Sequence, residues 1–166
     1  MNNKLSRGDR YEAKSVWALI CFIEGDKEQC EEVCGELYKN YLNTDVYCTL
    51  GYIYNLTRAP EEAVRFNLEA YDYNPDKAVI CDNLGQAYYL NGENEKALEL
   101  YESNEGKNPD FPEFYYNYAL VLIKAGNKEK AASVIETGLS KEFHNLTTVK
   151  REQLEELKKE LSEGKE

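Results

Sequence analysis

The sequence repeats itself every 34 residues, and this interval constrains the fold more than any other feature of the chain. A Leu-Gly-x-x-Tyr motif occurs twice at this spacing, and an alanine recurs three times. The residues are Leu50, Gly51 and Tyr54, then Leu84, Gly85 and Tyr88, and the alanines Ala63, Ala97 and Ala131. An earlier, degenerate copy is one residue shorter and carries Ala18, Cys21, Cys30 and Cys34. A unit of this length cannot bury its apolar face alone, so we expect the copies to stack.

Each copy is expected to form a pair of antiparallel helices. Gly51 and Gly85 fall in the middle of a helix, where glycine costs about 1 kcal/mol relative to alanine, so their recurrence indicates helices that cross closely. Pro75 and Pro109, each after an asparagine, separate one copy from the next. The predicted helices are 10–24 and 27–40, 44–57 and 60–73, 77–91 and 94–107, 111–125 and 128–141, followed by a ninth, 147–163.

This pattern resembles the tetratricopeptide repeat, a helix–turn–helix unit of the same period. The resemblance implies an all-α fold, a right-handed superhelical α-solenoid of antiparallel helix pairs with a C-terminal capping helix. The repeats would be 11–43 (degenerate), 44–77, 78–111 and 112–145, between a polar N-terminal segment 1–10 and a capping helix with its tail, 146–166. In that last helix Leu154, Leu157 and Leu161 form a narrow apolar stripe, suited to covering the final repeat.

Charge and apolar patterning exclude two classes of partner. The chain carries 31 acidic against 20 basic residues, a formal net charge of −11, which argues against binding a nucleic-acid backbone. Its longest apolar run, 16–23, is far shorter than the ~20 residues that span a bilayer, so we expect no membrane insertion. The N-terminal residues lack the apolar region of a signal peptide, so a cytoplasmic location is expected, with an exported fragment lacking its signal left open.

Candidate catalytic and metal-binding groups are scarce. The chain has a single histidine, His144, and no glycine-rich phosphate loop or nucleophile motif, so we expect no enzyme and no cofactor. Cys21, Cys30 and Cys34 could converge on a zinc ion. They occupy repeat positions that pack in the other copies, however, and free cysteine is among the most buried residue types. We therefore expect four of the five cysteines in the core and no metal site.

The resemblance also implies a concave groove lined by the first helix of each pair, which holds a peptide. At the groove positions, tyrosine offers flat contact area with a polar tip, and amides offer both donors and acceptors to a peptide backbone. The candidate contact residues are Tyr52, Asn55, Asp82, Asn83, Gln86, Tyr89, Glu113, Tyr116, Asn117 and Leu120.

The class of ligand follows from what these positions lack and from the local charge. Some members of the family hold a chaperone's C-terminal carboxylate with a clamp of lysine, arginine and asparagine, but Ser15, Leu19 and Val79 stand at three of those positions here. We therefore reject a carboxylate-clamp ligand. Residues 44–111 carry thirteen acids against five bases, which would attract a cationic or amphipathic partner.

Two hypotheses about function follow. The first is a non-enzymatic protein–protein interaction module that binds a peptide or helical segment of a partner in its groove, as an adaptor or co-chaperone, and is a monomer or a weak homo-oligomer. The alternative is a structural, self-associating scaffold piece of a longer repeat array, joined through the exposed first repeat.

Overall fold

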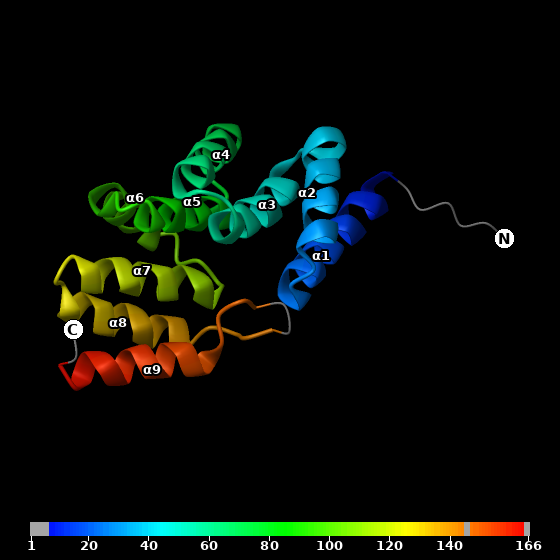
Figure 1. Ribbon diagram of the computed structural model, residues 1–166. Helices are drawn as coiled ribbons and strands as arrows, with labels where there is room; N and C mark the ends of the chain where they lie inside the picture. Colours follow the sequence, from blue (N-terminus) through cyan, green and yellow to red (C-terminus); the bar gives the residue numbers. More distant parts are fainter. Residues whose placement is uncertain (1–6, 145–146, 165–166) are drawn as a thin grey trace. The chain divides into compact units, whose positions relative to one another are not determined.

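The computed structural model describes residues 7–144 and 147–164, with side chains from Arg10 onward. Within these ranges all regular structure is helical, in nine helices (Figure 1). They are α1 Arg7–Glu24, α2 Lys27–Tyr41, α3 Thr44–Thr57, α4 Pro60–Tyr73, α5 Ala78–Leu90, α6 Asn94–Glu105, α7 Pro112–Lys124, α8 Lys128–Leu139 and α9 Arg151–Ser162. The chain forms two compact units, Met1–Asn83 and Leu84–Glu166, and the boundary falls within α5. The all-α helical-repeat fold is thus confirmed.

The helix bounds follow the expected ones closely, and α3 and α4 begin and end where the repeat places them. The side chain of Asn43 caps α3 by accepting from the backbone N–H groups of Asp45 and Val46, at 2.9 and 3.1 Å. Pro60 opens α4, where its missing N–H leaves no hydrogen bond unmade. The segment expected to precede the first repeat, 1–10, is partly helical, because α1 already begins at Arg7; residues 1–6 lie outside the described part.

Glycines in the left-handed backbone region close the first helix of three pairs. Gly25, Gly92 and Gly126 have φ values of 78°, 79° and 80°. After α1, the N–H of Asp26 donates to the carbonyl of Cys21 at 2.9 Å, and the turns after α5 and α7 repeat this bond. These are Schellman motifs, which satisfy the last carbonyls of a helix.

The core of unit 1 lies between α1, α2, α3 and α4. Fully buried aliphatic side chains come from α2 and α3, among them Leu37, Val46 and Leu50, and Ile80 joins them from the start of α5. Tyr54 meets Phe66 of α4 edge-on, with ring centroids 4.7 Å apart. The first two helix pairs therefore share one apolar core.

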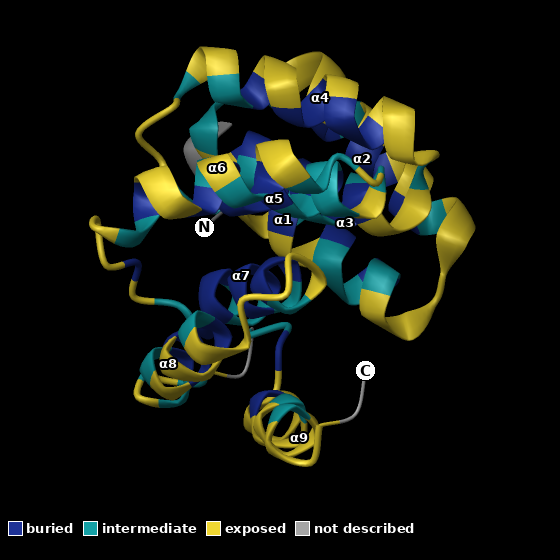
Figure 2. Cartoon of the chain, turned by 90° about the vertical axis from the view of Figure 1, so that its left-hand side faces the viewer, coloured by how far each residue is buried: buried dark blue, intermediate teal, exposed yellow. Residues whose placement is uncertain are grey.

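Unit 2 is built on α7, most of whose residues are buried (Figure 2). Phe114, Tyr118 and Leu122 of this helix are fully buried. Tyr118 stacks on Tyr101 of α6 with centroids 5.3 Å apart and an interplanar angle of 13°. Figure 1 shows α7, α8 and α9 side by side. Leu154 of α9 is fully buried, as expected for a helix that covers the last repeat.

The close helix crossings expected at the mid-helix glycines are confirmed. A Cβ atom placed on Gly51 would lie 2.4 Å from Asn67 Oδ1, and one placed on Gly85 would lie 2.6 Å from Tyr101 Cε2. Gly138 of α8 has the same role, since a Cβ atom there would lie 2.8 Å from Tyr115 Cβ. These contacts leave no room for a larger residue.

The last helix begins four residues later than expected. Thr148 precedes it in a non-helical segment, and both its backbone N–H and its hydroxyl donate to Glu113 of α7. The side chain of Gln153 then accepts from the backbone N–H of Lys150 at 2.8 Å, which caps the helix at Arg151. The contact of Thr148 with α7 thus replaces the helical turn that periodicity predicts.

Candidate functional site

The candidate groove residues of unit 1 take part in a buried chain of side-chain amides. Asn67 Nδ2 of α4 donates to Asn55 Oδ1 of α3 at 2.8 Å. Asn55 Nδ2 donates to the carbonyl of Asn83 in α5 at 2.8 Å, and Asn83 Nδ2 donates back to the carbonyl of Cys48 in α3, also at 2.8 Å. Three helices are therefore joined by amide hydrogen bonds. Both candidate asparagines of this unit, Asn55 and Asn83, donate to backbone carbonyls of neighbouring helices.

Asn67 is a member of this network that sequence reasoning missed. It is fully buried, and its Nδ2 also donates to the carbonyl of Ala63 at 3.0 Å. The equivalent position is Tyr101 in the third copy and Ile135 in the fourth, both large packing residues. A polar asparagine at such a position is the sequence signal that could have pointed to this network. The absence of a side chain at Gly51 makes room for the amide.

Tyr52 and Asp82 complete the candidate set of unit 1. Tyr52 is half-buried and meets Phe22 of α1 edge-on, with ring centroids 5.8 Å apart. Asp82 is buried. Its carboxylate therefore does not form part of the exposed surface, whereas part of Tyr52 does.

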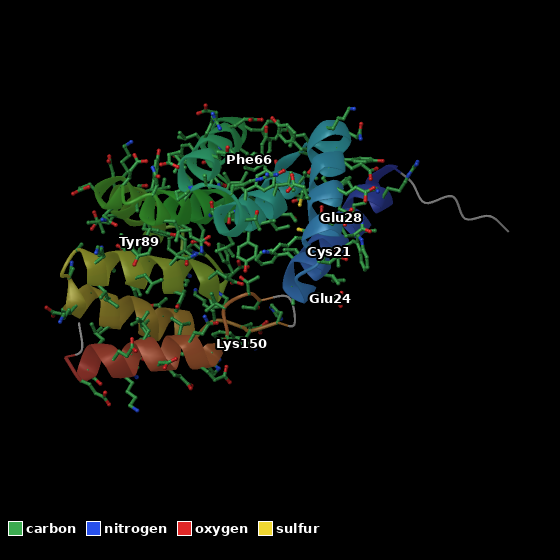
Figure 3. All side chains as sticks on the ribbon, in the orientation of Figure 1. Cys21, Glu24, Glu28, Phe66, Tyr89 and Lys150 are labelled. Atoms are coloured by element: carbon green, nitrogen blue, oxygen red, sulfur yellow. The ribbon has the colours of Figure 1, made fainter. Side chains whose placement is uncertain are left out.

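In unit 2 the candidate residues of α5 and α7 lie together. Gln86 Nε2 donates to Asn117 Oδ1 at 3.5 Å, which places these two helices side by side. Tyr89 of α5 and Tyr116 of α7 are both half-buried and pack against the same core cluster; Figure 3 labels Tyr89 beside α7. Leu120, one helical turn after Tyr116, is also half-buried. This face joins two aromatic rings, an aliphatic side chain and an amide.

Glu113 has a different environment from the one expected. One of its carboxylate oxygens, Oε1, accepts from the backbone N–H of Thr148 at 2.7 Å and from its hydroxyl at 3.1 Å. Hydrogen bonds to a carboxylate are among the stronger ones in proteins. The carboxylate therefore holds the segment before α9 against α7.

The five thiols are all free, and Cys21, Cys30, Cys34 and Cys81 are buried, as expected. Burial raises the pKa of Cys34 to about 12 and that of half-buried Cys48 to about 11. These thiols are therefore protonated near neutral pH, whereas metal ligation and nucleophilic attack require the thiolate. In the described ranges no group of three or more His, Cys, Asp or Glu side chains could hold a metal ion.

None of the helices in the described part of the chain is both long and apolar enough to cross a membrane.

Comparison with known proteins identifies the fold. The family model described as Tetratricopeptide repeat matches residues 112–140, which span α7 and α8. None of the curated proteins matches the sequence.

Solved structures extend the likeness to most of the chain. A thermophilic tetratricopeptide-repeat protein of Thermus thermophilus superposes with a TM-score of 0.74 at 18% identity, covering 93% of this chain and 83% of that one. A tetratricopeptide-repeat protein from Parabacteroides merdae has a TM-score of 0.58 at 23% identity, over 93% of this chain and 60% of that one. MamA protein has a TM-score of 0.58 at 17% identity, over 94% and 88% of the two chains. Residues 112–140 thus match a tetratricopeptide repeat in sequence, and the described part of the chain has the helical-repeat fold of these solved structures.

Proposed function

We propose that the chain is a non-enzymatic protein–protein interaction module that binds a peptide or helical segment of a partner, as an adaptor or co-chaperone. The fold supports protein partners in general, because stacked helix pairs present extended surfaces made of many side chains. The observation that carries the proposal is the face of unit 2, where Tyr89, Tyr116 and Leu120 are half-buried around Gln86. Rings that are anchored in a core and exposed along one edge give contact area at low entropic cost.

The amides of unit 1 enter this proposal as supports. Because Asn55 and Asn83 use their Nδ2 donors on neighbouring helices, they fix α5 against α3, the helix that carries Tyr52. A preorganised face loses less entropy on binding than a mobile one. Tyr52 is then the contact residue that unit 1 supplies.

The proposed partner segment is cationic or amphipathic. Residues 44–111 carry eight more acids than bases, and this excess would speed the approach of a basic segment at low salt. Since Asp82 is buried and Glu113 binds Thr148, the attraction would come from exposed acids elsewhere in this segment, such as Asp45 and Glu95.

A titration with defined peptides tests the proposal. The probe is a fluorescein-labelled 18-residue amphipathic helix made of leucine and lysine, and its counterpart carries glutamate in place of lysine. We expect the lysine peptide to bind, and the double substitution Tyr89→Ala with Tyr116→Ala to weaken it about tenfold or more, since interface aromatics each contribute about 1–2 kcal/mol. Tyr73→Ala removes an exposed ring at the end of α4 and is the matched control, expected to change affinity less than twofold.

Three results would contradict the proposal. The double variant could bind the lysine peptide as the parent does, which would exclude this face. The glutamate peptide could bind equally well, which would exclude the charge preference. Binding could also be insensitive to a change from 50 to 300 mM salt, although exposed charges are screened over that range.

A second candidate function is self-association through the first repeat. Trp17 is 47% exposed and Val16 is 42% exposed, and both lie on α1 with the more exposed Ile23. Large apolar side chains gathered on a surface mark interaction sites. Sedimentation velocity from 10 to 500 µM tests this function: we expect the weight-average mass to rise with concentration and the rise to disappear in Trp17→Lys. A strict monomer over the whole range excludes it.

A further inference from the structure

The degenerate first repeat leaves a pocket in unit 1. Its volume is about 560 Å³, within the range of about 300–1,000 Å³ that is typical of ligand pockets. It opens between the carboxyl end of α1, the amino end of α2 and the carboxyl half of α3. Its walls include Cys21, Cys30, Cys34 and Ile53, with Leu56 at the rim. None of these residues belongs to the peptide face proposed above, so each proposal can fail without the other.

The pocket arises where two packing positions of the repeat hold small side chains. The place of Cys21 is taken by Tyr54 and Tyr88 in the next two copies, and the place of Cys34 is taken by Tyr101 in the third. In that third copy, the Tyr101 ring fills the space above Gly85, which is the equivalent of Ala18. A thiol is much smaller than a phenol ring, and in the first copy the buried thiols form the floor of the pocket, with Phe22, Tyr54 and Leu56 around it.

The walls of the pocket are suited to apolar contact. Cys30 Sγ lies 4.0 Å from Cys34 Sγ and donates to the carbonyl of Ala18 at 3.7 Å. Burial raises the pKa of all three thiols, so they line the pocket as neutral groups. Neutral buried cysteine behaves as a small apolar residue rather than as a nucleophile or a metal ligand.

The rim of the pocket is acidic. Asp26 and Glu28 line it, and Glu24 lies at the end of α1, where its charge is felt at Cys21; Figure 3 labels Cys21, Glu24 and Glu28. The rim also contains Lys27, while Arg58 forms an ion pair with Glu31, which leaves an excess of negative charge. The carboxyl ends of α1 and α3 border the pocket, against the amino end of α2 alone. Because a helix carboxyl end carries partial negative charge, this arrangement also favours a cation.

We propose that this pocket binds one apolar side chain of a partner protein, an aromatic or long aliphatic residue flanked by lysine or arginine. The apolar group packs over the buried thiols against Phe22, Tyr54 and Leu56, and the flanking cation contacts the acidic rim. The occupant is a peptide segment of another protein, because the rim is open to solvent and carries charge next to an apolar interior.

Titration of the ¹⁵N-labelled full chain with short capped peptides, followed by amide chemical shifts, tests the proposal. The probe is acetyl-Lys-Phe-Lys-amide. Acetyl-Glu-Phe-Glu-amide reverses the charge, and acetyl-Lys-Gly-Lys-amide removes the ring. For the probe we expect saturable shifts at Cys21, Ile53 and Leu56, with a dissociation constant of about 1 mM, as suits a single anchoring side chain. Both controls should bind about tenfold more weakly or not at all.

Three substitutions locate the site. Cys21→Tyr restores the residue of the later copies and fills the pocket, so we expect it to abolish the shifts. Leu56→Ser changes a side chain that is 47% exposed and therefore leaves the fold intact; we expect about fivefold weaker binding, whereas Leu68→Ser, on α4 at 38% exposure, should have no effect. Glu28→Lys should weaken binding severalfold, and Glu32→Lys, on the same helix outside the pocket, should not.

Several outcomes would overturn the proposal. The probe could give no shifts at 20 mM, or shifts away from α1 and α3. Acetyl-Lys-Gly-Lys-amide could bind as tightly as the probe, which would leave the pocket without a role. The variants Cys21→Tyr and Leu56→Ser could both bind the probe as the parent does. Equal binding of the glutamate peptide would contradict the cationic flank.

Discussion

Asn55 of α3 and Asn83 of α5 are joined by a buried hydrogen bond, from the side-chain amide of the first to the backbone carbonyl of the second, at 2.8 Å. Asn83 is itself 3% exposed and returns a bond of the same length to the carbonyl of Cys48. Two consecutive first helices of the repeat are thereby held in register by reciprocal bonds. Apolar packing alone would allow them to slide, because it is not directional.

We predict that Asn55→Ala destabilises the protein by about 2–3 kcal/mol. The change removes the bond to Asn83 and also leaves Asn67 Nδ2 without one of its acceptors in a dry interior, where an unsatisfied group costs about 1–3 kcal/mol. Urea unfolding measures the loss. Lys39→Ala, at an exposed site near the end of α2, is the control and should change stability by less than about 0.5 kcal/mol. Equal effects of the two substitutions would show that the amide chain contributes little.

We predict opposite signs for two glycine-to-alanine substitutions within helices. Gly85→Ala places a Cβ 2.6 Å from Tyr101 Cε2, so the ring must move and stability should fall by about 1–3 kcal/mol. Gly35→Ala, in α2, meets no atom within 4 Å and should raise stability by about 0.5–1 kcal/mol through helix propensity. Thermal unfolding of the two variants gives the comparison. A stabilising Gly85→Ala would contradict the close crossing.

We predict that the protein loses stability at alkaline pH, because folding raises the pKa of its buried thiols. The pKa of Cys34 rises from 9.0 to about 12 on folding, so the unfolded chain releases this proton first as the pH rises. The protonated Cys34 thiol makes its full contribution to the free energy of unfolding below about pH 9. This contribution decreases as the pH rises toward 12, with a slope of at most about 1.4 kcal/mol per pH unit for one thiol. Urea unfolding between pH 9 and 10 should show this slope, and Cys34→Ala should flatten it. If the stability of Cys34→Ala fell with pH as steeply as that of the parent, the loss would come from groups other than Cys34.

How far the fold can be predicted from the sequence depends on which contacts repeat. Gly51 and Gly85 indicate close crossings, and both crossings are present, because a contact that recurs along the repeat keeps a small residue at the same position. The turns at Gly25, Gly92 and Gly126 are predictable for the same reason.

The candidate site was less predictable, because periodicity assigns a residue to a helix face but not to a partner. Asn55 and Asn83 lie at the edge between two faces, and their amides reach the adjacent helix. Asn67 replaces a packing residue in one copy only, so no repeat pattern describes its bonds. Glu113 binds Thr148, which is 35 residues away in a segment outside any regular helix. Contacts that occur once in the chain leave no periodic signal.

The bond between Glu113 and Thr148 leads to the last prediction. Glu113→Ala removes the only acceptor that the described residues provide for the Thr148 backbone N–H, so its hydrogen exchange should accelerate by about tenfold or more. The amide of Leu154 should change much less, because α9 keeps its own cap and its buried contact with α8. Glu129→Ala, an exposed acid on α8, is the matched control. Exchange that accelerates equally at Thr148 and Leu154 would instead show that Glu113 holds the whole of α9 in place.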